Sequence, residues 1–144
     1  MSCAEKITLE PPQAVPFGPL YFPNGLLGFE QVHRYVLAEC AEQKHLLQLN
    51  LATDPTLSFL VTPTSFLAEP YDPEISNEHS AFLQLEHPED ALILNIVTLQ
   101  EDHKASVNLK GPLIINRHTL VGKQIIPRNV SSFSLQHPLN LTDL

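Results

Sequence analysis

The stretch ALILNIVTL, residues Ala91 to Leu99, decides how this chain folds. Only Asn95 and Thr98 interrupt its apolar character, and they fall on opposite faces of an extended chain. A strand that is apolar on both faces belongs in the middle of a sheet, where neighbouring structure covers it on each side. The stretch therefore predicts a central core strand.

Short segments of similar character lie on both sides of it. Thirteen prolines and five glycines divide the chain into these short pieces, and no repeat or linker is evident. Asn77 to Leu85 is the one predicted helix, with Ser76 or Asn77 as its cap and Glu78 in its first turn. The remaining predicted strands are Lys6–Leu9, Gly18–Phe22, Val36–Cys40, Leu46–Leu51, Ser58–Thr62, Leu113–Ile115 and Val121–Ile126.

Strands that do not alternate with helices favour a barrel or sandwich over a doubly wound α/β sheet. We predict a mainly β, single-domain, small β-barrel-like fold with about eight short strands and one short helix. The domain covers residues 1–144, with a core from about 6 to 139 and short, frayed termini.

The sequence shows neither a membrane-spanning segment nor a signal peptide, and this indicates where in the cell the protein is found. The longest apolar runs are far shorter than the roughly 18 residues of a membrane span, and no basic start precedes an apolar core as in a signal peptide. We therefore expect a cytoplasmic protein that does not contact a membrane. Its two cysteines, Cys3 and Cys40, are then expected to be reduced.

Charge is distributed unevenly along the chain, which has a net charge of -8. From His45 to His103 there is no Lys or Arg, whereas from His103 to Thr142 there is no Asp or Glu. A chain with this charge is not expected to bind nucleic acid, because phosphate binding needs clustered Lys and Arg residues. Two alternatives remain open for the folded protein: an acidic patch that attracts a basic partner, or a mixed surface in which the two segments fold onto each other.

No arrangement of residues points to catalysis. Seven histidines show no metal-binding spacing, and no nucleophile lies in a catalytic motif. The carboxylate pairs Glu89–Asp90 and Glu101–Asp102 flank the central strand, where acidic turn residues are common. We predict no enzyme activity, no metal and no cofactor. The alternative is a small-ligand-binding or enzymatic β-barrel whose cleft is built from residues distant in sequence.

The loop FPNGLLGFE, residues Phe22 to Glu30, resembles the signature loop of the FliW family of flagellar assembly factors. Four further blocks agree in order: FLVTP at 59–63, NIVT at 95–98, VNLKGPLIIN at 107–116 and GKQ at 122–124. The likeness covers about Lys6 to Leu139. This chain departs from the family pattern at Leu27, where proline is usual, at Gly111, where alanine is common, and at 134–139, where only His-Pro-Leu is kept.

This resemblance implies a chaperone-like protein that binds flagellin in the cytoplasm. It also implies that, by partner switching, the protein binds and antagonises the translational regulator CsrA, which relieves repression of flagellin translation. The free protein is expected to be a monomer. The acidic span suits a basic RNA-binding regulator, because complementary charge speeds encounter.

Candidate protein-binding residues come from loops and strand ends. In the signature loop, Asn24 and Glu30 can present polar contacts, while Gly25 and Gly28 allow tight turns and the aromatic residues fill the core. A second candidate loop, bounded by prolines, holds Phe66, Leu67, Glu69, Tyr71 and Asp72. Asn116 is a further candidate, although the internal pairing of Asn95, Asn108 and Asn116 is the favoured interpretation for these strand asparagines.

Overall fold

The computed structural model describes residues 19–40, 46–67, 71–102 and 104–140. It contains one antiparallel sheet of nine strands, one short helix and three 3₁₀ turns among these residues. The elements are β1 (Pro19–Tyr21), β2 (Arg34–Glu39), β3 (Leu47–Leu51), β4 (Asp54–Pro63), α1 (Asn77–Phe82), β5 (Ala91–Leu99), β6 (Lys104–Val107), β7 (Leu113–Asn116), β8 (Gly122–Gln124) and β9 (His137–Asn140), with 3₁₀ turns at Thr64–Phe66, Pro88–Asp90 and Val130–Ser132. The predicted mainly β fold is confirmed. The predicted strand at Lys6–Leu9 lies outside the described residues.

Strand β5 has the predicted bounds and is the strand at which the sheet branches. Along one edge it pairs with β4, and along the other it pairs with β7 through its first half and with β6 through its second half. Strand β6 continues to β9, and β7 continues to β8. Its two faces are both packed, since Leu92 and Leu94 belong to the main buried cluster while Ile93 and Val97, on the other face, pack in two further clusters. This burial explains its nearly continuous apolar sequence.

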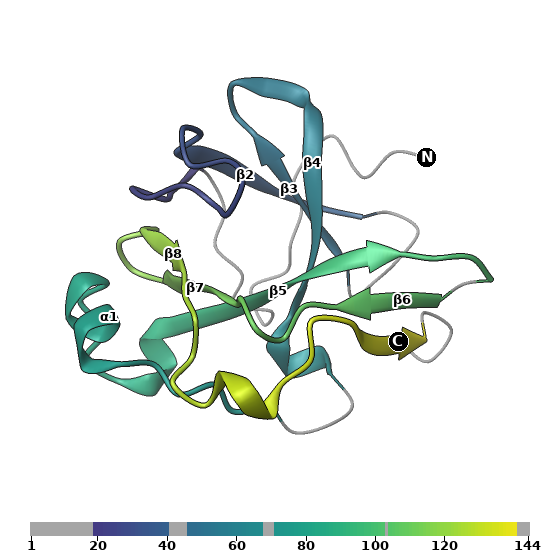
Figure 1. Ribbon diagram of the computed structural model, residues 1–144. Helices are drawn as coiled ribbons and strands as arrows, with labels where there is room; N and C mark the ends of the chain where they lie inside the picture. The colour runs from purple at the N-terminus through teal and green to yellow at the C-terminus, as the bar shows by residue number, and fades with distance from the viewer. Residues whose placement is uncertain (1–18, 41–45, 68–70, 103, 141–144) are drawn as a thin grey trace.

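The sheet curls into a half-barrel, so that the β1–β2 end comes round toward the β7–β8 hairpin (Figure 1). We call the place where these two ends meet the seam. One parallel bridge joins Tyr21 to Val121 across it, and the backbone N–H of Tyr21 donates to the Leu120 carbonyl at 3.0 Å. Leu20, Leu37, Leu49 and other fully buried side chains fill the concave side. The two ends of the sheet thus meet through loops and one bridge, which leaves room for a surface pocket.

The helix and two strands differ modestly from expectation. Helix α1 ends at Phe82, three residues early, and Ser76 is its cap, since the Ser76 hydroxyl accepts from the His79 N–H at 3.2 Å. Strands β6 and β9 were not predicted. Each has four residues. Pro138 is tolerated in β9 because, among the strands that the structure describes, β9 pairs with β6 alone and stands at the end of the strand order.

The expectation for the cysteines is wrong at Cys40, which is disulfide-bonded in the structure. Cys3 lies outside the described residues. The expectation rested on the compartment, which governs whether disulfides persist and not whether two sulfur atoms come within bonding distance. No helix in the described part of the chain is long and apolar enough to cross a bilayer.

Candidate functional site

The signature loop between β1 and β2 is a succession of tight turns. Gly25 and Gly28 both have positive φ, at 66° and 85°, as the sequence predicted. The Gly25 N–H donates to the Phe22 carbonyl at 2.9 Å, and the Phe29 N–H donates to the Leu26 carbonyl at 2.7 Å. A Cβ atom on Gly25 would lie 2.5 Å from the Phe29 carbonyl oxygen, so no other residue fits there without moving backbone.

Aromatic side chains hold this loop on the core. The ring of Phe22 is fully buried and packs edge-on against Tyr35 at 5.5 Å, while Phe29 packs edge-on against Phe59 at 5.1 Å. Gly122 of β8 lies so close to the Phe22 ring that a Cβ would come within 2.7 Å of it. The loop is therefore fixed to both ends of the sheet, in agreement with the structural role predicted for its aromatic and glycine residues.

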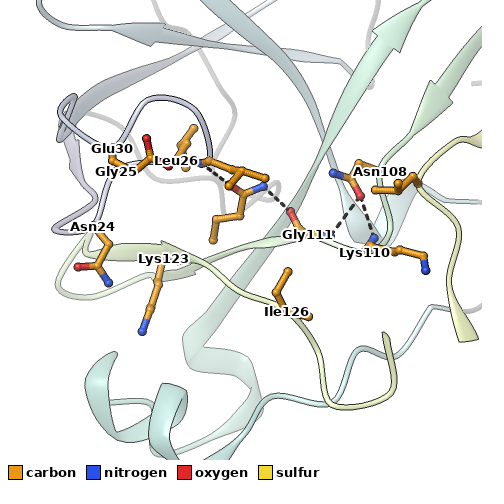
Figure 2. Close-up of a pocket in the computed structure, with 12 residues that line it drawn as sticks. Asn24, Gly25, Leu26, Glu30, Asn108, Lys110, Gly111, Lys123 and Ile126 are labelled. Atoms are coloured by element: carbon orange, nitrogen blue, oxygen red, sulfur yellow. Dashed lines mark hydrogen bonds between the residues drawn. The ribbon is translucent and has the colours of Figure 1, made fainter. Parts of the chain in front are cut away.

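The Gln124 side chain fastens the seam of the half-barrel. Its Oε1 accepts from the backbone N–H of Leu27 at 2.8 Å, and its Nε2 donates to the carbonyl of Gly111 at 3.0 Å (Figure 2). One amide thus joins the signature loop, β8 and the β6–β7 connection. The last of these is itself fixed by Asn108, whose Oδ1 accepts from the N–H groups of Lys110 and Gly111.

A pocket of about 310 Å³ opens on this seam. Its wall carries the exposed side chains of Leu27, Ile126 and Leu135, which are 80%, 62% and 60% accessible. The complete lining is Asn24, Gly25, Leu26, Leu27, Glu30, Asn108, Lys110, Gly111, Lys123, Gln124, Ile126 and Leu135. We call it the seam pocket.

Three charged groups line the seam pocket. In the view of Figure 2, the Lys110 and Lys123 side chains flank Ile126. The Lys123 ammonium lies 4.6 Å from the centre of the Phe82 ring, a cation–π contact with α1. Glu30 accepts a hydrogen bond from the Gly28 N–H at 3.1 Å, and this bond lowers the pKa of its carboxyl group.

Two of the predicted binding residues, Asn24 and Glu30, are brought together at this pocket, and both are exposed. The second predicted loop lies elsewhere. Tyr71 is half-buried, packs edge-on against Phe133 at 4.8 Å and donates its hydroxyl to the Leu109 carbonyl at 2.6 Å. Leu67, like Tyr71, packs against the buried cluster that contains Leu109. Asp72 is exposed, and Phe66 ends the 3₁₀ turn after β4. Glu69 lies outside the described residues.

The strand asparagines are paired internally, as the favoured interpretation predicted. Asn116 is 2% exposed, its Nδ2 donates to the Leu83 carbonyl at 2.8 Å, and its Oδ1 accepts from the His118 N–H at 2.8 Å. Asn95 stands at the branch of β5, where it donates to the Asn108 carbonyl and accepts from Thr64 Oγ1 at 2.7 Å. The Asn116 amide is thus committed within the protein.

A second hollow, which we call the polar hollow, lies where β7 ends and the turn after α1 reaches β5. It measures about 600 Å³ and is lined by Gln84, Glu86, His87, Asp90, Asn116, His118 and Thr119. The Asp90 carboxylate accepts from the N–H groups of His87 and Glu86 and lies 3.0 Å from His118 Nε2. The two backbone bonds, and after them His118, lower the pKa of Asp90. No group of residues suited to holding a metal ion occurs in the described part of the chain.

The acidic span does not form a single patch. Glu89–Asp90 and Glu101–Asp102 stand at opposite ends of β5, whose nine residues extend over roughly 30 Å. Basic residues from the later segment lie beside acidic ones: the backbone N–H groups of Lys104, Arg117 and Arg128 donate to the carbonyls of Glu101, Asp90 and Glu74. At these three places the backbones of basic and acidic residues are thus neighbours.

Sequence reasoning missed the residues that give the seam pocket its character, namely Leu27, Lys110, Lys123, Gln124, Ile126 and Leu135. One signal was available: Leu27 is an apolar residue inside a turn. The others come from segments far apart in the chain, and their exposure cannot be read from a local pattern.

The fold and the seam pocket define a class: small, mainly β proteins with a half-barrel sheet and a preformed pocket where its ends meet. The FliW protein family model matches residues 4–139, and this chain belongs to the FliW family. The chain is similar to the flagellar assembly factor FliW of Natranaerobius thermophilus, with 39% identity over 82% of this chain and 79% of the relative. It is also similar to the flagellar assembly factors FliW of Leptospira interrogans, with 34% identity over 83% of this chain and 86% of the relative, and of Clostridium botulinum, with 31% identity over 83% of this chain and 84% of the relative.

A solved structure agrees in fold. The crystal structure of the flagellar assembly factor FliW superposes with a TM-score of 0.71 at 24% identity, covering 85% of this chain and 84% of that one. FliW is a family of assembly factors and not of enzymes, so family membership confirms the non-enzymatic prediction.

Proposed function

We propose that this chain is a cytoplasmic flagellar assembly factor that binds flagellin and, by partner switching, binds and antagonises CsrA. Membership of the FliW family over residues 4–139 is the observation that carries the proposal. While flagellin is abundant in the cell it occupies the factor; once flagellin is exported, the factor is free to bind CsrA and relieve repression of flagellin translation. The free protein is a monomer in this scheme.

The rigid seam supports a role in binding. A surface that is already ordered loses little conformational entropy on association, and here hydrogen bonds from Gln124 and Asn108 hold the loops before any partner arrives. The Asn24 and Glu30 side chains stand on such a preformed surface. We therefore keep them as contact residues of the proposal.

The separation of the acidic residues changes what is expected for CsrA. A single acidic face over the whole span would give steep salt dependence, whereas two small clusters about 30 Å apart give a shallower one, since a partner covers one of them. We propose that the contribution of charge to CsrA binding comes from one end of β5 and is modest.

The test is calorimetry combined with size-exclusion chromatography, using the flagellin and CsrA of the same organism at low and moderate salt. Saturable one-to-one binding to flagellin, and CsrA binding that excludes flagellin, are the expected results. Failure of flagellin to bind would remove the proposal. Simultaneous binding of both proteins would remove the partner switch, and CsrA affinity that does not respond to salt would remove the charge contribution.

A further inference from the structure

Among the described residues, the most exposed apolar side chains lie at the seam pocket. Seven large apolar side chains are exposed in the described part of the chain, and the three most exposed of them, Leu27, Ile126 and Leu135, all line this one pocket. Scattered exposed leucines are ordinary on a soluble protein, whereas a contiguous apolar group around a hollow marks an interaction site. A volume of about 310 Å³ is at the small end for binding pockets, so it suits a few side chains of a partner.

The polar groups of the pocket are largely used within the protein. Both ends of the Gln124 amide are hydrogen-bonded to backbone, and Asn108 Oδ1 already accepts two N–H groups. A ligand that depends on many polar contacts therefore finds few partners here. An apolar ligand finds a surface whose loops are already fixed by these hydrogen bonds.

The charged side chains of the pocket indicate which kind of ligand it can bind. Of the five Lys and Arg residues between His103 and Thr142, Lys110 and Lys123 line the pocket. No ion pair of either ammonium occurs in the part of the chain that the structure describes, and the Lys123 ammonium lies over the ring of Phe82. Glu30 is the one carboxylate in the lining, and its charge is held by the Gly28 N–H. The pocket is thus a small cationic site on an otherwise acidic protein.

We infer that the seam pocket holds an apolar segment of flagellin that carries at least one carboxylate, with its apolar side chains against Leu27, Ile126 and Leu135 and its carboxylate facing Lys110 and Lys123. This inference rests on the proposed function, because that function supplies the partner. A basic RNA-binding regulator meets like charge at these lysines, so the pocket favours flagellin over CsrA. A second copy of this acidic chain is disfavoured by general repulsion.

The test measures flagellin affinity, by calorimetry at two salt concentrations, for the full chain and four variants. Leu135→Ser removes an apolar contact and Lys110→Gln removes a charge. Each places an uncharged polar side chain at a position that solvent reaches. Their matched controls are Leu57→Ser, an exposed leucine on β4, and Lys104→Gln, an exposed lysine on β6. Thermal unfolding and circular dichroism check that all four variants fold like the parent.

Leu135→Ser is expected to weaken flagellin binding about tenfold with unchanged salt dependence, as for an apolar contact residue. Lys110→Gln is expected to weaken it several-fold and to flatten the salt dependence, because a charge pair has been removed. The controls should match the parent in flagellin affinity, and CsrA affinity should not change in the two pocket variants.

The outcomes separate the two proposals. If the parent binds flagellin and the pocket variants bind it equally well, the seam pocket is not the flagellin-binding site and the proposed function still stands. If the pocket variants lose CsrA binding or self-association instead, the choice of occupant is wrong. If the parent does not bind flagellin, the proposed function fails and this inference fails with it.

Discussion

The seam pocket and the polar hollow lie at opposite ends of strand β7 and use their polar groups differently. At the seam pocket, which adjoins Gly111 before β7, amide side chains are used to fix loops and the remaining surface is apolar with two cations. At the polar hollow, where β7 ends in Asn116, the Asn116 amide bonds to backbone, and the Asp90 carboxylate bonds to backbone and to His118. Charges that satisfy each other hold a structure together, whereas apolar groups left at a rigid surface are available to a partner.

This comparison predicts that changes in the polar hollow alter stability alone, while changes at the rim of the seam pocket alter binding alone. A residue that shapes the seam pocket from beneath should alter both. Each of the following changes tests one part of that division.

Gly25→Ala should have the largest effect on stability. The new Cβ would come within 2.7 Å of backbone atoms of Phe29 and Glu30, and φ at this position is 66°. A close contact with backbone added to a left-handed conformation should cost about 3 kcal/mol, measured as the loss of unfolding free energy in urea.

Gly28→Ala is its matched control, because φ there is also positive, at 85°, while nothing lies within 4 Å of the new Cβ. It should cost only about 1 kcal/mol. Equal losses for the two variants would show that backbone conformation alone matters in the loop, and that the close approach of Gly25 to the Phe29–Glu30 backbone does not shape the pocket.

The difference between the two glycines also shows what sequence can and cannot predict. The order Pro23-Asn24-Gly25 predicts a sharp turn, and the turn is there, because turn preference is a local property. The clash that makes Gly25 irreplaceable involves backbone four and five residues later, which only the folded loop reveals.

The same distinction applies to the fold. Strand β5 was predicted with correct bounds because its apolar run reports burial on both faces. Strand β6, KASV, has no such run, and its place in the sheet is set by its partners β5 and β9. In the seam pocket Asn24 and Glu30 were predicted from their loop, whereas Lys110, Lys123 and Leu135 come from three later segments that only the curl of the sheet brings together.

Asn116→Ala should have the next largest effect, and on stability alone. It leaves the Leu83 carbonyl and the His118 N–H without their partner at a buried position, and it frees the turn in which Gln84 has a φ of 58°. A cost of about 2 kcal/mol is expected in urea unfolding, with flagellin affinity per folded molecule unchanged.

Asn129→Ala provides the comparison for Asn116. Its side chain also joins two segments, since it accepts from the Glu74 N–H and donates to the Asp72 carbonyl, but at an exposed place where water replaces lost bonds. A loss of about 0.5 kcal/mol is expected. If Asn116→Ala weakened flagellin binding after correction for folding, Asn116 would return as a contact residue and the division between the two hollows would be wrong.

Asp90→Asn should have the smallest effect on stability, and its dependence on pH identifies the cause. Hydrogen bonds from His87 and Glu86, and then His118, lower the pKa of Asp90 in the folded protein. A carboxyl whose pKa is lower in the folded state stabilises that state at pH above its unfolded value of about 3.9, and this stabilisation is lost as the pH falls through the folded value. The stability difference between parent and Asp90→Asn should therefore be constant from about pH 7 to pH 5 and shrink below about pH 4. A difference that grew toward acid pH would have the wrong sign for a carboxylate held by donors, and Asp90 could then no longer be counted among the groups that hold the polar hollow together.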